Sequence, residues 1–152
     1  MKARDVMTSP AVAVRPHMSV RDVAALLVSH GFTAAPVVDV EGCVRGIVTE
    51  ADLLRGRVTP EEGPGAPGSD VPVSTVMMPA PVLMGPEDDL TQVVEVMLHR
   101  GVRTVPIVEH GHLIGIVTRR DVLRRVAGPE LAGAGSAARR AARSAEGIVF
   151  PK

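Results

Sequence analysis

The sequence contains GIVTEAD at residues 46–52 and GIVTRRD at residues 115–121. Each stretch is apolar up to its threonine and polar after it, which is typical of a buried strand that passes into a helix. A threonine followed three residues later by an acid is also the sequence form of a helix capping box. The two stretches therefore predict the same strand-to-helix junction at two places in one chain.

An internal repeat extends outward from these junctions. Gly31 matches Gly101 at an offset of 70 residues, and Asp52 matches Asp121 at an offset of 69 residues after one deletion in a loop. The matches fall on glycines, prolines and the Thr/Asp pairs, which chance does not readily produce. The chain therefore contains two copies of one structural unit.

Each copy predicts the order strand, helix, strand, strand, helix, which makes the fold class α/β (α+β). The first helix of each copy carries apolar residues at helical spacing and ends at Gly31 or Gly101. A hairpin and a second helix, which begins at the threonine, complete the copy. Because each copy has fewer than about 60 ordered residues, we expect the two to share one core.

The repeat sets the predicted domain boundaries. The first copy spans residues 3–56 and the second spans residues 72–127. The Gly- and Pro-rich residues 57–71 form the predicted linker. Residues 128–152 form an Ala- and Arg-rich tail, which we interpret as a partly helical solvated extension.

Bulk composition excludes several classes of protein. Seventeen basic residues balance seventeen acidic ones, and Trp and Tyr are absent. This argues against nucleic acid as a partner, which favours basic surfaces and aromatic stacking. No apolar run is long enough for a membrane span or a signal peptide. A single cysteine, Cys43, suits a reducing compartment, so we expect a cytoplasmic protein.

Catalytic and metal-binding patterns find little support. His110 and His112 flank a glycine, but no third ligand is near them in the sequence. Cys43 has no neighbouring base that would activate its thiol. We therefore expect no enzyme activity, no metal site and no required cofactor.

Three motifs together carry a resemblance to a known family. They are the Asp5-Val6-Met7 opening, the Gly-x-x-x-x-Pro spacing of residues 31–36 and 101–106, and the Gly-Ile-Val-Thr-x-x-Asp junction. The chain resembles a tandem pair of CBS domains, also called a Bateman module, over residues 3 to about 127. The resemblance implies a pseudo-twofold module, a disk-like homodimer, and clefts that bind AMP, ADP, ATP or S-adenosylmethionine.

The junction chemistry supports a ligand site independently. The free N–H groups at a helix N-terminus favour phosphate, and a carboxylate one turn later can accept the hydroxyls of a ribose. Arg119 and Arg120 add positive charge to the second junction, where the first has Glu50 and Ala51. We expect the second junction to bind phosphate more strongly. A capping box that only starts its helix remains the alternative.

The resemblance also implies which residues line two clefts. Site 1 comprises Val12, Phe32, Thr33, Ala34, Ile116, Thr118, Arg119, Arg120 and Asp121. Site 2 comprises Val82, Val102, Arg103, Thr104, Ile47, Thr49 and Asp52. Arg103 departs from the small apolar residue expected beside a base, so it either contacts phosphate or obstructs site 2.

The sequence thus predicts a non-catalytic regulatory module that senses an adenosine-containing ligand and acts through a homodimer or on another protein. The main alternative is a protein-interaction scaffold with vestigial pockets that uses its tail to bind a partner. A nucleic-acid-binding CBS protein and a detached regulatory subunit of an enzyme or transporter are further alternatives.

Overall fold

The computed structural model describes residues 1–57 and 71–128, and the chain divides into two compact units. The Asp52 unit contains the described residues between Val12 and Pro81. The Asp121 unit contains Met1–Ala11 together with the described residues from Val82 onward. Each copy of the repeat therefore gives its opening residues to the unit built around the other copy.

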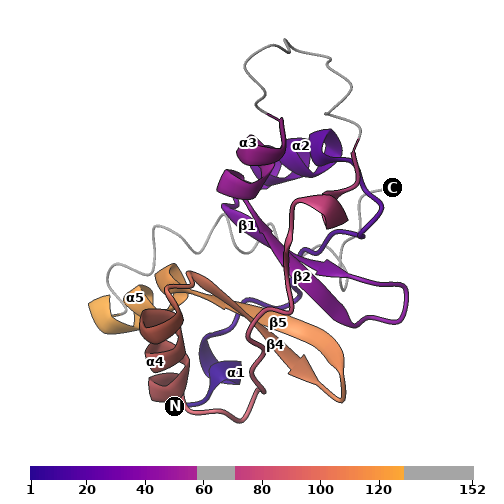
Figure 1. The fold of residues 1–152 in the computed structure, drawn as a ribbon. Coiled ribbons are helices and arrows are strands. Elements are labelled where there is room, and N and C mark those ends of the chain that lie inside the picture. The colour runs from indigo at the N-terminus through magenta and orange to yellow at the C-terminus, as the bar shows by residue number, and fades with distance from the viewer. Residues whose placement is uncertain (58–70, 129–152) are drawn as a thin grey trace. The chain divides into compact units, whose positions relative to one another are not determined.

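The Asp52 unit is a three-stranded antiparallel sheet with helices packed on it (Figure 1). Along the chain its elements are α2 (Val20–His30), β1 (Ala34–Val38), β2 (Val44–Thr49), α3 (Glu50–Arg57), the 3-10 helix η2 (Val73–Thr75) and β3 (Met78–Pro79). The strand order is β1-β2-β3, so β2 is central.

Local sequence explains the limits of α2. The Ser19 hydroxyl accepts a hydrogen bond from the Asp22 N–H at 3.0 Å, which caps the first turn. Gly31 ends the helix in the left-handed conformation, with φ of 66°, which only glycine adopts at little cost. Val20, Val23 and Leu27 face the core and are almost fully buried. The predicted apolar face and terminal glycine of this helix are confirmed.

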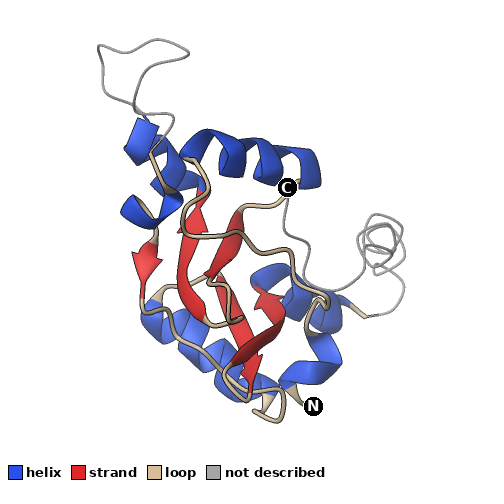
Figure 2. Ribbon diagram, turned by 90° about the vertical axis from the view of Figure 1, so that its right-hand side faces the viewer, coloured by secondary structure: helices blue, strands red, loops and turns tan. Residues whose placement is uncertain are grey.

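The Asp121 unit repeats this plan with a two-stranded sheet. Its elements are α1 (Ala3–Val6), α4 (Leu90–Arg100), β4 (Thr104–Glu109), β5 (His112–Thr118) and α5 (Arg119–Ala127). In both units helices cover the strands (Figure 2). Helix α1 contacts α5 and β5, although these elements come from opposite ends of the described chain (Figure 1).

In place of each predicted first strand the structure has only isolated bridges, among them one parallel bridge in each copy. Val14 pairs with Val37, and Met84 pairs with Ile107. Prolines lie on both sides of each bridge in the sequence. Because proline has no N–H to donate, the pairing does not extend into a longer ladder.

Opening residues 1–11 join β5 through backbone pairing. Thr8 and Ile116 exchange two hydrogen bonds, at 2.8 Å from the Thr8 N–H and 3.1 Å from the Ile116 N–H. The backbones approach closely because position 115 is glycine: a Cβ there would lie 2.6 Å from Met7 Sδ and 3.0 Å from the Thr8 carbonyl oxygen. The repeated glycine of the GIVT motif is therefore a packing requirement.

The same arrangement holds β3 against β2 in the Asp52 unit. Gly46 pairs with Pro79, and Ile47 pairs with Met78. A Cβ on Gly46 would lie 2.6 Å from Met77 Sδ. Both units therefore use the same glycine to admit a methionine from the other copy's opening segment.

Two ion pairs fix the N-terminus to the segment before α4. Lys2 Nζ lies 3.0 Å from Asp89 Oδ1, and Arg4 pairs with Glu87. The Lys2 hydrogen bond lowers the pKa of the Asp89 carboxyl. These contacts assign Met1–Ala11 to the Asp121 unit by charge as well as by backbone pairing.

Residues 58–70 of the predicted linker and residues 129–152 of the predicted tail lie outside the described residues. At the linker's edges, Arg57 belongs to α3, and the Val71 carbonyl accepts a hydrogen bond from the Val20 N–H at 2.9 Å. Within residues 1–57 and 71–128, no helix is long and apolar enough to cross a membrane.

Candidate ligand-binding junctions

At the Asp121 junction, strand β5 ends and helix α5 begins. The Asp121 Oδ2 accepts hydrogen bonds from the Thr118 N–H at 2.8 Å and the Thr118 hydroxyl at 2.9 Å. In return, the Thr118 hydroxyl accepts from the Asp121 N–H at 3.2 Å. Asp121 is 3% exposed. The predicted capping box is therefore formed, and it fixes the orientation of the carboxylate.

The Asp52 junction has the same capping geometry. Asp52 Oδ2 accepts from the Thr49 N–H and the Thr49 hydroxyl, both at 2.9 Å. Asp52 is 7% exposed. The local sequence alone thus builds two nearly identical strand-to-helix junctions.

The other oxygen of each carboxylate has a different partner. Asp52 Oδ1 accepts a 2.6 Å hydrogen bond from Arg55 Nη2, one turn further along α3. Asp121 Oδ1 accepts a longer one, 3.4 Å, from the Thr8 hydroxyl. The equivalent of Thr8 at the other junction is Met78, which has no hydroxyl. The contacts of the two carboxylates therefore include Arg55 at Asp52 and Thr8 at Asp121.

Charge also separates the junctions. Arg119 and Arg120 are exposed in the first turn of α5, where Arg119 Nε donates to the Val102 carbonyl at 3.3 Å. Glu50 and Ala51 are exposed at the start of α3. A helix N-terminus attracts anions, and the two arginines add to that attraction while Glu50 opposes it.

The remaining predicted site residues divide between the units. The Asp52 unit holds Val12, Phe32, Thr33, Ala34, Ile47, Thr49 and Asp52. The Asp121 unit holds Val82, Val102, Arg103, Thr104, Ile116, Thr118, Arg119, Arg120 and Asp121. Each unit thus contains one half of site 1 and one half of site 2, and each half is described within its own unit.

Within each unit, the hairpin places one half of site 1 next to one half of site 2. Ala34 pairs with Thr49, and the Thr33 carbonyl accepts from the Glu50 N–H at 3.0 Å. In the Asp121 unit Thr104 pairs with Thr118. There the exposed Arg103 contributes its carbonyl, which accepts from the Arg119 N–H at 3.0 Å.

Several of the predicted site residues are largely buried. Val12 is 8% exposed and Thr104 is 8% exposed, while Ile47 and Ile116 are each 9% exposed. Phe32 is half-buried against the core of the Asp52 unit, and its ring stacks on His30 with centroids 5.3 Å apart. Thr33 and Arg103 are exposed.

Sequence reasoning missed Thr8 and Arg55 as neighbours of the two carboxylates. Arg55 could have been found, because it lies three residues after Asp52 and thus on the same helix face. Thr8 could not, because no pattern shows that the first eleven residues join the other copy.

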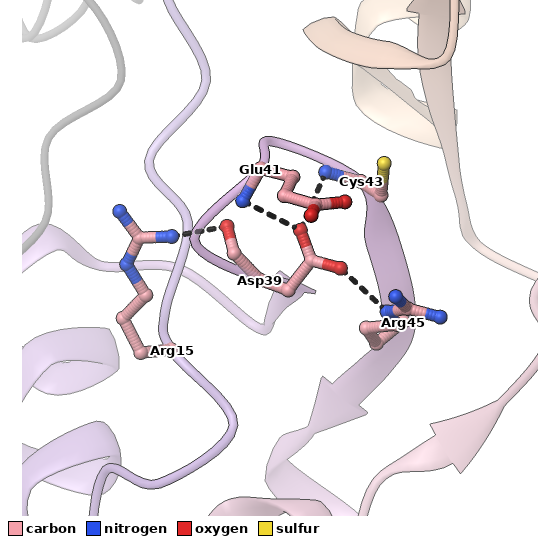
Figure 3. A network of polar contacts seen from close by, with 5 residues as sticks. All are labelled: Arg15, Asp39, Glu41, Cys43 and Arg45. Carbon is pink, nitrogen blue, oxygen red and sulfur yellow. Dashed lines mark hydrogen bonds and ion pairs between the residues drawn. The ribbon is translucent and has the colours of Figure 1, made fainter.

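A separate polar cluster lies in the β1–β2 turn (Figure 3). Ligand atoms of Asp39, Glu41 and Cys43 lie within 4.8 Å of one another, which is compact enough for a metal ion. However, Asp39 Oδ1 accepts from the backbone N–H groups of Glu41 and Cys43 at 2.9 and 3.0 Å, and Oδ2 accepts from Arg45 at 2.6 Å. Both oxygens of the Asp39 carboxylate thus accept hydrogen bonds from within the hairpin.

The electrostatics of this turn agree with a structural role. The Cys43 N–H, followed by Arg45, lowers the pKa of the Asp39 carboxyl. Arg15 additionally donates to the Asp39 backbone carbonyl (Figure 3). Two guanidinium groups around one acid stabilise the turn and oppose binding of a cation.

The model of the CBS domain family matches residues 3–58 and again residues 73–128. The chain belongs to the CBS domain family. It is a CBS pair, which confirms both the predicted family and the predicted fold class. Each matched segment includes opening residues of its copy, and these residues belong to the structural unit built around the other copy.

Curated relatives place this CBS pair in different contexts. It is 30% identical over 131 residues to the CBS domain-containing protein YhcV of Bacillus subtilis, covering 86% of this chain and 89% of YhcV. It is 29% identical over 127 residues to the A-adding tRNA nucleotidyltransferase of Aquifex aeolicus, covering 83% of this chain. The CBS pair spans only 14% of that enzyme's length.

Solved structures share its fold. CBSX2 in complex with AMP aligns with a TM-score of 0.71 and 28% identity, covering 83% of this chain and 96% of CBSX2. The CBS pair of MJ0100, in complex with 5'-methylthioadenosine and S-adenosyl-L-methionine, aligns with a TM-score of 0.74 and 21% identity. That alignment covers 84% of this chain and 97% of the MJ0100 chain.

Proposed function

We propose that this CBS pair is a non-catalytic regulatory module of the cytoplasm that binds an adenosine-containing ligand, namely AMP, ADP, ATP or S-adenosylmethionine. One observation carries the proposal. The first turn of α5 holds the buried, oriented carboxylate of Asp121 together with Arg119 and Arg120. The AMP complex of CBSX2, which shares the fold, supports the same class of ligand.

The chemical roles follow from the residue types. The Asp121 carboxylate accepts hydrogen bonds from ribose hydroxyls, and Thr118 holds it in place. Arg119 and Arg120 stabilise phosphate together with the helix N-terminus. Apolar residues of predicted site 1, such as Val12 and Ala34, enclose the adenine ring. Binding changes the protein only as far as the ligand prefers one conformation over another.

Calorimetric titration of the full chain with AMP, ADP, ATP and S-adenosylmethionine tests the proposal. We expect saturable binding of at least one of them, weakened by Asp121→Ala in the Asp121 half-site. Asp22→Ala, which removes an exposed carboxylate from α2, is the control for the lost charge. Absence of heat and of a thermal shift with all four ligands would reject the proposal.

We also propose that two CBS pairs associate as a homodimer through helix surfaces. Large apolar residues are exposed at equivalent positions of both copies: Val28 and Leu98 at 82% and 72%, and Leu54 and Leu123 at 62% and 61%. A second copy of the chain would present the same positions and could cover them. Such paired exposure is more than the scattered apolar residues of an ordinary surface.

One observation favours the scaffold alternative. In both copies the Thr/Asp pair already satisfies its own capping contacts, as a purely structural junction would. A scaffold would keep its partner but bind no nucleotide, and deletion of residues 129–152 would abolish partner capture. In the sensor, that deletion leaves nucleotide binding intact.

A further inference from the structure

Equivalent methionines of the two copies lie directly on the backbone of the strand that carries the GIVT motif. An ideal Cβ built on Gly115 would lie 2.6 Å from Met7 Sδ, and one built on Gly46 would lie 2.6 Å from Met77 Sδ. Each sulfur therefore fills the space that a side chain of the strand would otherwise occupy. Packing this close leaves no room for an additional atom between the sulfur and the strand.

The groups around each sulfur are unsuited to a polar atom. The same two Cβ positions lie 3.0 Å from the Thr8 carbonyl oxygen and 2.7 Å from the Met78 carbonyl oxygen, and both are hydrogen-bond acceptors. Beyond the backbone, Met7 and Met77 each pack against the apolar core of one unit. An oxygen atom on either sulfur would meet acceptors and hydrocarbon, so its own hydrogen-bonding capacity would be unsatisfied.

Partial exposure makes these two sulfur atoms accessible to a small oxidant. Met7 and Met77 are half-buried, whereas Met97 in α4 is 3% exposed and Met78 is 56% exposed. Oxidation of a thioether requires only that the oxidant reach the sulfur. Met7 and Met77 thus combine access with a packing role, a combination that neither the enclosed Met97 nor the exposed Met78 has.

The segments that carry these methionines have few backbone contacts with the GIVT strands. Thr8 and Ile116 exchange two hydrogen bonds, and β3 pairs with β2 over only two residues, Met78 and Pro79. Proline has no N–H to donate, which weakens the second pairing further. The methionine contact is therefore a main element of the attachment of each segment to its strand.

We propose that Met7 and Met77 are oxidation sites at which hydrogen peroxide loosens the exchanged segments from β5 and β2. The sulfur lone pair attacks one peroxide oxygen, the S–O bond forms as the O–O bond breaks, and the second oxygen leaves as water with both protons. Sulfur is oxidised by two electrons and the peroxide is reduced. The sulfoxide no longer fits between strand and core. This inference is independent of the proposed function, because it requires no bound ligand.

Peroxide treatment of the full chain tests the proposal, with peptide mass spectrometry to locate the sulfoxides. Oxidation of Met7 should accelerate hydrogen exchange of the Thr8 and Ile116 amides about tenfold or more, because their mutual hydrogen bonds open. The Tm should fall by about 5 °C or more. Methionine sulfoxide reductase should restore both properties, since the modification is reversible.

Paired substitutions separate these sites from the other methionines. Met7→Leu combined with Met77→Leu should keep the Tm within about 2 °C after the same treatment, because leucine conserves the volume and has no sulfur. Met18→Leu combined with Met84→Leu is the matched control. It removes two other half-buried methionines, which lie outside the exchanged segments, and it should remain as sensitive to peroxide as the wild type.

Three results would overturn the proposal. They are sulfoxide at both sites without faster amide exchange or a lower Tm, no oxidation of either site while the chain is folded, and an equal loss of Tm in the wild type and the Met7/Met77 variant. Circular dichroism before treatment checks that each variant is folded. If the Met7/Met77 variant does not fold, amide exchange in the oxidised wild type decides alone.

Discussion

Thr8 and Ile116 exchange both of their backbone hydrogen bonds, at 2.8 and 3.1 Å, although they lie near opposite ends of the described chain. This exchange makes residues 1–11 part of the unit built around the second copy. Residues 71–81 do the same for the first copy through β3. The boundaries of the sequence repeat and of the structural units are therefore different.

Gly115→Ala should destabilise the Asp121 unit by about 1–3 kcal/mol, because the new Cβ would clash with Met7 Sδ and the Thr8 carbonyl oxygen. Thermal denaturation of the full chain measures the loss. Met7→Ala in the same background removes one of the two clashing groups and should recover part of it. Strictly additive losses in the double variant would contradict this packing argument.

A fragment spanning residues 12–81 should be more stable than a fragment of equal length spanning residues 1–70. The first contains the fully buried Val73 of η2 and the strand β3, whereas the second loses both and carries residues 1–11 without their partner β5. Urea denaturation followed by circular dichroism compares them. Equal stability would show that the exchanged segments contribute little.

The sequence predicted the helices, hairpins and junctions because each depends on local rules. Capping pairs, helical apolar spacing and terminal glycines act within about one turn, so they can be recognised in any context. Which copy a segment packs against does not depend on such local rules. Met7 and Met77 occupy equivalent apolar positions, and nothing in either segment indicates that each packs on a glycine of the other copy.

The candidate site was predictable to a similar depth. Thr118 and Asp121 form the expected capping contacts, but a sequence pattern cannot show which further groups occupy a carboxylate. Thr8 reaches Asp121 only through the segment exchange. The remaining contacts assigned to Val12, Phe32 and Arg103 stay predictions, because they require two separate units to contribute to one cleft.

Arg119→Gln combined with Arg120→Gln should weaken AMP binding about three- to tenfold and leave adenosine binding nearly unchanged, since only AMP carries the phosphate. Calorimetry with both ligands gives the ratio, which should shrink at high salt. Glu50→Gln, at the position equivalent to Arg119, is the matched control. An equal loss for AMP and adenosine would show that the arginines do not act on phosphate.

Asp39→Asn should reduce stability at neutral pH and have less effect in acid. Because the Cys43 N–H and Arg45 lower the pKa of Asp39 in the folded protein, its carboxylate stabilises the fold at pH values above the ordinary aspartate pKa of 3.8. That contribution is lost as the pH falls through the lower folded value. Urea denaturation at pH 7 and pH 3 tests this, with Glu41→Gln as control. An equal effect at both pH values would contradict it.

Leu98→Glu and Leu123→Glu should shift the proposed dimer to monomer, because each places a charge on a surface that the second copy would bury. Sedimentation velocity measures the shift. Val40→Glu is the control, because it adds the same charge in the β1–β2 turn, where Val40 is 85% exposed, and not on a helix. The second hairpin already carries an acid, Glu109, at its turn, so a glutamate is compatible with such a turn. A dimer that survives both helix variants would place the interface elsewhere.

The exchange of opening segments also sets an order for biosynthesis. During synthesis, the described residues of the Asp52 unit, 12–57 and 71–81, all emerge before residues 82–128. Residues 1–11 are made before β5, so Thr8 gains its partner Ile116 only after β5 has emerged. Docking of residues 1–11 is therefore coupled to synthesis of the second copy.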